Sequence, residues 1–246
     1  MKAEALAAQP ALVAVTTTSK REILNVHAMP KRRLATILAA DVVGYSRLMQ
    51  QDDCGTLETL KQNRSRIGEI SAIHQGRVVN TAGDSILVEF SSAVEAFAAA
   101  IEVQDSIESC NEKLDPQQRM HFRIGMDLGD ILVDSDGSVY GNGVNIAARM
   151  EAMARQGGIV MSGKVFDEVA ARLQHRFLAL GRRRVKNIRD RVRAYEVMPR
   201  TTTDRSIQAV PRLATIARGL LTAAVRYLVS SLGGLNANHA LSAPVE

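Results

Sequence analysis

The chain has 246 residues, of which 46% are hydrophobic and 23% are charged. This length suits one substantial domain with tails and is too short for two full-sized domains. Only 4% of the residues are aromatic and there is no tryptophan, so sequence-specific stacking on nucleic-acid bases is not expected. The net charge of +5 comes from the two ends, because residues 1–33 carry six basic and two acidic side chains and residues 199–246 carry five and two. The middle is slightly acidic, and we expect no nucleic-acid partner.

The cysteines and the N-terminus bear on the compartment. Cys54 and Cys110 lack the spacing of a metal site or a redox pair, which fits a reducing cytosol. Residues 1–30 show weak periodicity, and their short apolar run is interrupted by Glu4 and Pro10. They make a poor signal peptide and are expected to form a mobile N-terminal segment. We therefore expect a cytoplasmic protein.

The hydrophobic pattern predicts an alternation of strands and helices. An apolar run of strand length is followed by a helical pattern, a hairpin, an alanine-rich helix and a further strand. The strand falls at 34–43, the helical pattern ends at about 74, and the hairpin, the alanine-rich helix and the further strand fall at about 76–90, 92–111 and 121–133. The resulting order β-α-β-β-α-β is typical of an α+β fold with a ferredoxin-like split β-α-β core, in which helices cover one face of an antiparallel sheet.

Additional C-terminal helices and strands follow this core, so residues 31–198 are assigned to one folded domain. The first is a helix at about 141–156, followed by a short strand within 157–163 and by another helix. Two terminal strands are predicted near 176–181 and 192–198. Residues 199–246 form a C-terminal tail with a predicted amphipathic helix. Arg218 and Arg226 interrupt its apolar stretch, so no run reaches the roughly 20 residues that span a bilayer. This helix could lie at the inner face of a membrane, or pack on its own domain or on a second copy.

Two aspartates stand at places where carboxylates could meet. Asp41 ends the first apolar strand and Asp84 lies in the turn of the hairpin. Taken singly, Asp41 could be a helix cap and Asp84 an ordinary turn residue. In a split β-α-β sheet, however, the first strand lies beside the hairpin, so both carboxylates can reach one edge. There they could hold Mg²⁺ or Mn²⁺, and free backbone amides at 42–46 would suit a polyphosphate.

A third cluster is the segment YGNGVNIAARME at 140–151. Its glycines allow close approach of the backbone, and the following helix places Asn145 and Arg149 on one face, four residues apart. An amide paired with a guanidinium suits an oxygen-rich ligand whose charge grows during a reaction. The alternative is a helix N-terminus with a surface arginine.

Six landmarks in order resemble the catalytic domain of class III nucleotidyl cyclases, the adenylate and guanylate cyclases, and in particular the bacterial group common in rhizobia. The resemblance covers about residues 31–198. It rests on RRLATILAADVVGYSRLM, GRVVNTAGDSILVEF, FRIGMDLGDILV, GNGVNIAARMEAMA, GGIVMSG and VKNIRDRVRAYEV.

The resemblance implies a homodimer with two active sites at the subunit interface, which converts a nucleoside triphosphate to its 3′,5′-cyclic monophosphate and pyrophosphate. It implies two divalent cations as cofactors, held by Asp41, Asp84 and the backbone of Val42. It further implies that Asn145 orients the ribose and Arg149 stabilises charge on the reacting phosphate, both from the other subunit. The triphosphate would be bound by the backbone of Val43 and Gly44 and by Lys186, with Arg189 as a competing candidate.

The chain departs from the family at the two residues that recognise the base. Adenylate cyclases typically have a lysine where this chain has Asn80, and an aspartate, sometimes threonine or serine, where it has Ser138, so Ser138 lies within the known variation and Asn80 is the larger departure. Asn80 and Ser138 can each donate or accept a hydrogen bond. We expect ATP as the substrate with only a modest preference over GTP. A guanylate cyclase and a regulatory pseudocyclase that binds nucleotide without turnover are the alternatives.

Overall fold

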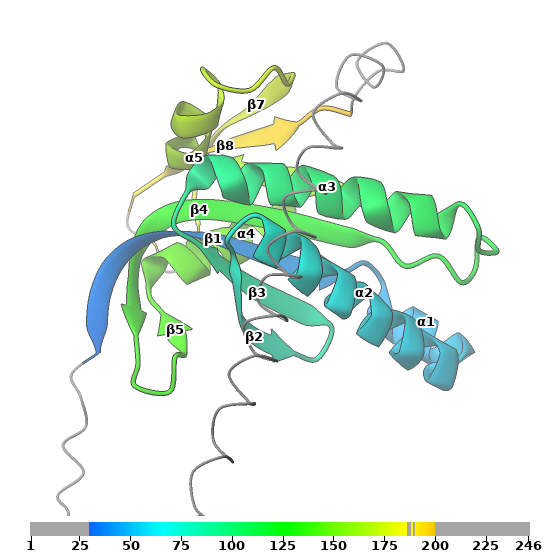
Figure 1. Cartoon of the computed structure of the whole chain (residues 1–246). Helices are drawn as coiled ribbons and strands as arrows, with labels where there is room; N and C mark the ends of the chain where they lie inside the picture. Colours follow the sequence, from blue (N-terminus) through cyan, green and yellow to red (C-terminus); the bar gives the residue numbers. More distant parts are fainter. Residues whose placement is uncertain (1–29, 186–187, 189, 200–246) are drawn as a thin grey trace, which may run out of the picture.

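The computed structural model describes residues 30–185, 188 and 190–199. Within these residues the chain forms an eight-stranded sheet with helices packed on it (Figure 1). The elements in chain order are β1 Lys31–Val42, α1 Tyr45–Gln51, α2 Asp53–Ile73, β2 Arg77–Ala82, β3 Ser85–Phe90, α3 Ala93–Asn111, β4 Phe122–Val133, β5 Val139–Tyr140, α4 Asn142–Met153, β6 Ile159–Ser162, α5 Gly163–Val169, β7 Phe177–Arg183 and β8 Val192–Val197.

The first four long strands form the predicted core. They lie in the order β2-β3-β1-β4, and every neighbouring pair is antiparallel. This is the arrangement of the split β-α-β fold, so the predicted α+β fold with a ferredoxin-like core is confirmed. Strand β6 adds to β4 in parallel, and β8 and β7 extend the sheet beyond it. The sheet as a whole is therefore mixed. Helix α4 connects the β4–β5 hairpin to β6 and lets β6 run parallel to β4.

Helices α2 and α3 begin at well-formed caps. The Asp52 carboxylate accepts a hydrogen bond from the Gly55 amide at 2.9 Å, and the Ser92 hydroxyl accepts one from Glu95 at 3.3 Å. Such caps satisfy amides that have no partner inside the helix. The predicted single helix up to about residue 74 is thus two helices, since the extended backbone at Asp52 separates α1 from α2.

The two faces of the sheet carry different helices. Side chains from α1, α2, α3 and α5 share one core with alternate residues of β1, β3 and β4, including Leu38, Phe97 and Phe122. Helix α4 packs on the opposite face, and Figure 1 shows it behind the sheet as seen from α2 and α3. A Cβ added at Gly125 would lie 1.9 Å from the backbone nitrogen of Glu151. Only glycine allows α4 to approach β4 so closely.

The ends of the chain lie outside the described residues. This holds for the predicted N-terminal segment up to residue 29 and for the C-terminal tail after residue 199, including its predicted amphipathic helix and any association with a membrane. None of the helices in the described part of the chain is long and apolar enough to cross a bilayer. The boundaries of the domain at 31 and 198 remain a prediction.

Candidate active site

Asp41 stands near the end of β1, directly opposite Arg123 of β4. Residues that face each other across two strands point to the same side of the sheet. Nη2 of Arg123 donates to Oδ2 of Asp41 at 3.1 Å, and Nε of the same guanidinium lies 2.9 Å from Oε1 of Glu151 on α4. Arg123 thus links β1 to α4 and adds a positive charge beside Asp41.

Asp84 occupies the turn between β2 and β3, next to Gly83, whose φ is 58°. Burial of its carboxyl and then the negative charge of Asp41 raise the pKa of Asp84 above its usual value. Strand β1 pairs with β3, with Ala40 opposite Ile86, so Asp41 at the end of β1 lies beside the turn that holds Asp84. The structure brings together the two aspartates that the sequence analysis paired.

An adjacent pair of carboxylates suits a hard divalent cation. Mg²⁺ is commonly held by one or two carboxylates together with water and substrate phosphates, and a cation would relieve the repulsion between Asp41 and Asp84. No three or more histidine, cysteine, aspartate or glutamate side chains within 30–185, 188 and 190–199 are arranged to hold a metal by themselves. The carboxylate oxygens of Asp41 and Asp84 therefore fit a divalent cation that completes its coordination with phosphate oxygens of a substrate.

The backbone after β1 differs in one respect from the expectation. The amide of Val43 donates to the carbonyl of His121 at 2.9 Å, so within this chain it is not one of the free amides expected at 42–46, and its role in binding a phosphate remains a prediction. The reason is that β1 continues its pairing with the chain before β4 for one residue past Val42. Gly44 adopts the left-handed conformation, with φ 69° and ψ 31°, and precedes α1. Roles for the Val42 carbonyl in metal binding and for the Gly44 amide in phosphate binding remain predictions.

Asn145 and Arg149 lie on the exposed side of α4. The helix buries Gly143, Ile146, Ala147 and Met150 against the sheet, whereas Asn145 and Arg149 face solvent. In the described part of the chain no hydrogen bond or ion pair joins either of them to Asp41 or Asp84. A single chain therefore presents the amide and guanidinium pair on a surface of its own.

The two base-recognition candidates belong to neighbouring segments. Asn80 is exposed on the edge strand β2, and Ser138 closes the turn between β4 and β5. Nη1 of Arg77 on β2 donates to the Gly137 carbonyl at 3.2 Å, which holds this turn beside β2. The Ser138 hydroxyl donates to Oδ2 of Asp136 at 2.9 Å.

Two charged residues near the metal candidates were missed by the sequence analysis. Arg123 interrupts an otherwise apolar strand, and Glu151 follows Arg149 on α4; a charge inside a buried pattern was the signal for each. Burial raises the pKa of Glu151 to about 7, against the opposing effect of Arg123 and with added repulsion from Asp41 and Asp84. The expected triphosphate ligands Lys186 and Arg189 lie outside the described residues.

Asp127 is a second buried carboxyl, on the face of β4 that α4 covers. It is 1% exposed, and burial raises its pKa to about 6, although Ser162 and Lys164 act in the opposite direction. The folded protein therefore holds this proton more tightly than the unfolded chain, so the free energy of unfolding should fall as pH rises from about 4 to 6 and stay low above it.

Asp127→Asn should remove this penalty. We expect the variant to gain roughly 2 kcal/mol at pH 7.5 and much less at pH 4.5, as measured by thermal unfolding at both values. Asp136→Asn is the matched control, because hydrogen bonds from Ser138 lower the pKa of Asp136 and its replacement should not stabilise the protein. A gain that does not grow with pH would contradict the assignment.

Comparison with known proteins places these observations in a family. Residues 28–199 match the "Adenylate and Guanylate cyclase catalytic domain" family. A protein of Rhizobium meliloti (strain 1021), "Putative adenylate cyclase 3", is 42% identical over 171 residues, which is 69% of this chain and 29% of that protein. An adenylate cyclase of Glutamicibacter nicotianae is 31% identical over 122 residues, 49% of this chain and 28% of that protein. The chain thus spans less than a third of the length of these curated relatives.

Solved structures agree with the sequence match. The adenylate/guanylate cyclase/hydrolase from Silicibacter pomeroyi has a TM-score of 0.65 and 37% identity, and the match covers 70% of this chain and 99% of that one. The adenylyl cyclase CyaB from P. aeruginosa has a TM-score of 0.63 at 19% identity, covering 71% and 98%, which shows a shared fold. From its fold, its matched residues and its relatives, the chain belongs to the adenylate and guanylate cyclase catalytic domain family, the class III nucleotidyl cyclases.

Proposed function

We propose that this chain is an adenylate cyclase that converts ATP to 3′,5′-cyclic AMP and pyrophosphate, at a site shared by two copies of the chain. The observation that carries the proposal is the adjacency of Asp41 and Asp84: strand β1 pairs with β3, Ala40 lies opposite Ile86, and the end of β1 therefore lies beside the turn that holds Asp84. Two neighbouring carboxylates, one near the end of a strand and one in the adjacent turn, suit the metal ions of a phosphoryl-transfer reaction.

The carboxylates would hold two Mg²⁺ or Mn²⁺ ions. When bound, such ions lower the pKa of the ribose 3′-hydroxyl and neutralise the charge of the phosphates. Asp41 and Asp84 provide the anionic oxygens, and Arg123 keeps the Asp41 side chain in one orientation through its hydrogen bond at 3.1 Å. The 3′-hydroxyl would lose its proton to water, its oxygen would form a bond to the α-phosphorus as the bond to pyrophosphate breaks in line, and no side chain of the protein becomes a nucleophile.

The second copy would supply Asn145 and Arg149. Both are exposed on α4, where they are free to enter the site of a partner. In our proposal the Asn145 amide orients the ribose and the Arg149 guanidinium stabilises the charge that develops on the reacting phosphate. Lys186, with Arg189 as the alternative, would contact the terminal phosphates.

The base would be read by Asn80 and Ser138. The Ser138 hydroxyl, which donates to Asp136 in this structure, can rotate, so it can accept from the amino group of adenine or donate to the O6 atom of guanine. The neutral amide of Asn80 can pair with either purine by rotation. Recognition by such groups leaves few unpaired atoms with the wrong base, so ATP is preferred only modestly over GTP.

The direct test is an assay of the purified protein with ATP or GTP and with Mn²⁺ or Mg²⁺, with the cyclic product identified by mass. We expect cyclic AMP as the main product and a smaller amount of cyclic GMP. A main product of cyclic GMP would make the chain a guanylate cyclase. Nucleotide binding without any product would identify it as a pseudocyclase and overturn the proposal.

Asn80→Lys should raise selectivity for ATP. The lysine ammonium can donate a hydrogen bond to adenine N1, whereas guanine N1 carries a hydrogen and cannot accept one. We therefore expect the ratio of kcat/KM for ATP over GTP to rise by roughly tenfold. Ser138→Asp alongside Asn80→Lys should increase it further if Ser138 by itself cannot hold the adenine amino group. A wild-type protein that already rejects GTP by several orders of magnitude would show that other residues read the base.

A further inference from the structure

Arg64 of α2 reaches the turn that carries Asp84. Its Nη2 group donates to the carbonyl of Gly83 at 2.5 Å and to the carbonyl of Ser85 at 3.1 Å. These carbonyls belong to the two neighbours of Asp84 in the chain. The Ser85 hydroxyl closes the same turn by donating to the Ala82 carbonyl at 2.7 Å. One guanidinium nitrogen thus fastens both sides of the turn to a helix of the core.

The hairpin depends on such an anchor because of its place in the sheet. Strand β2 is an edge strand, five of its six residues are exposed, and its pairing with β3 shifts register between Val78 and Asn80. An edge strand with a bulge is held by fewer bonds than a central one. The position of the turn, and with it of Asp84, is therefore weakly determined by the strands alone.

Arg64 itself is held in an unusual state. Its Nε atom is buried, and in the described part of the chain it has no hydrogen-bond partner. A buried donor without a partner is unfavourable. The two hydrogen bonds that Nη2 donates to the turn offset this cost and keep the side chain in its observed conformation. The conformation of Arg64 thus satisfies the carbonyls of the turn and leaves its own Nε donor without a partner among the described residues.

We propose that Arg64 is a positioning residue that holds the Asp84 turn where Asp84 and Asp41 can bind the same metal ions. This inference rests on the proposed function, and it gives α2 a part in the site. Arg64 acts through the backbone of Gly83 and Ser85 and needs no contact with metal or substrate.

The positive charge of Arg64 lets the direction of the change in metal affinity distinguish two roles. A positive charge near Asp84 repels a cation, so a purely electrostatic role predicts that a neutral replacement tightens metal binding. Holding the turn in place predicts the opposite, because the freed turn must be ordered again whenever a metal binds. The two roles are thus separated by the direction of one measured change.

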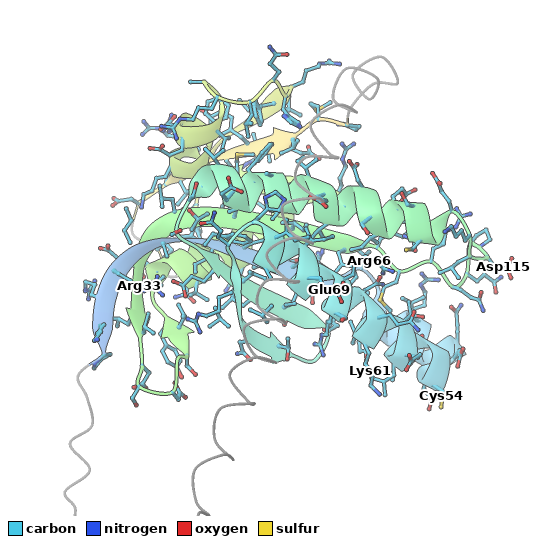
Figure 2. All side chains as sticks on the ribbon, in the orientation of Figure 1. Arg33, Cys54, Lys61, Arg66, Glu69 and Asp115 are labelled. Atoms are coloured by element: carbon cyan, nitrogen blue, oxygen red, sulfur yellow. The ribbon has the colours of Figure 1, made fainter. Side chains whose placement is uncertain are left out.

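The experiment uses Arg64→Met, which removes both hydrogen bonds while keeping an apolar stem. Arg66→Met is the matched control, since Arg66, labelled on α2 in Figure 2, donates to Asn63 Oδ1 of its own helix at 2.9 Å. Binding of Mn²⁺ is measured by electron paramagnetic resonance in the presence of α,β-methylene-ATP, an analogue that cannot release pyrophosphate. Hydrogen exchange of the amides at 83–86 is followed in the metal-free proteins.

We expect Arg64→Met to raise the Kd for Mn²⁺ about tenfold and to speed exchange at 83–86, while Arg66→Met leaves both unchanged. Arg64→Lys, which keeps a donor, should recover part of the loss. An unchanged or lower Kd in Arg64→Met would overturn the positioning role. Asp84→Asn separates this from the proposed function: if it binds Mn²⁺ as well as the wild type, the metal site itself is wrongly assigned.

Discussion

Asp41→Ala and Asp84→Ala should each lower kcat for cyclic nucleotide formation by about a thousandfold or more. Each replacement removes one of the two carboxylates that meet at the end of β1, and the remaining one cannot hold both cations. Neither change should unfold the protein. Asp84 lies in the turn between β2 and β3, and both burial of its carboxyl and the charge of Asp41 raise its pKa, so removing this carboxyl should not destabilise the fold.

Asp41 needs one further variant, because its loss leaves Arg123 paired with Glu151 alone. Asp41→Asn keeps an oxygen that accepts from Arg123 but removes the negative charge, and it should be as inactive as Asp41→Ala. Asp115→Ala, at the far end of α3 in Figure 2, is the control for loss of an exposed aspartate and should retain full activity. Turnover near the wild-type level in Asp41→Asn or Asp84→Ala would sink the two-metal assignment.

Mixing inactive Asp41→Ala and Arg149→Ala proteins should restore activity. Arg149 faces away from the sheet of its own chain, so we expect it to serve the Asp41 and Asp84 of a second copy. A mixed dimer then contains one site in which both residues are intact. With random exchange of subunits in an equal mixture, half of the dimers are mixed, and recovery should approach roughly a quarter of the wild-type activity.

The matched control is a mixture of Asp41→Ala with Asp84→Ala. Both residues belong to the metal half of a site, so neither site of the mixed dimer is intact and no recovery is expected. Exchange of subunits is verified with two differently tagged chains. Recovery in this control, or none with Arg149→Ala after verified exchange, would show that the halves of the site are divided in another way.

Much of the core follows from local patterns. The strand that ends at Asp41 and the hairpin around Asp84 are visible as apolar runs and turn residues, because a buried strand needs continuous apolar side chains. Strand β1 nevertheless begins at Lys31, earlier than its apolar run. Its first residues are exposed and pair with the end of β4, and exposed strand residues leave no hydrophobic signal.

The sequence allowed only some residues of the candidate site to be predicted. Asp41, Asp84, Asn145 and Arg149 stand in motifs that can be read along the chain. Arg123 and Arg64 act on residues far from them in sequence, by contacts with Asp41 and with the carbonyls around Asp84. Hydrogen bonds between distant segments depend on register and side-chain reach, which a linear pattern does not contain.

The sequence by itself determined the family, the α+β core and the candidates for the chemistry, because these depend on residue types and spacings along the chain. Only the tertiary structure decided that α4 packs on the face opposite α2 and α3, with Gly125 beneath it. That placement leaves Asn145 and Arg149 on an exposed surface while Asp41 and Asp84 lie together where β1 ends beside the β2–β3 turn. The physical reason is that the side on which a helix packs is set by long-range burial and close backbone contact, whereas helix periodicity only defines which of its own residues are apolar.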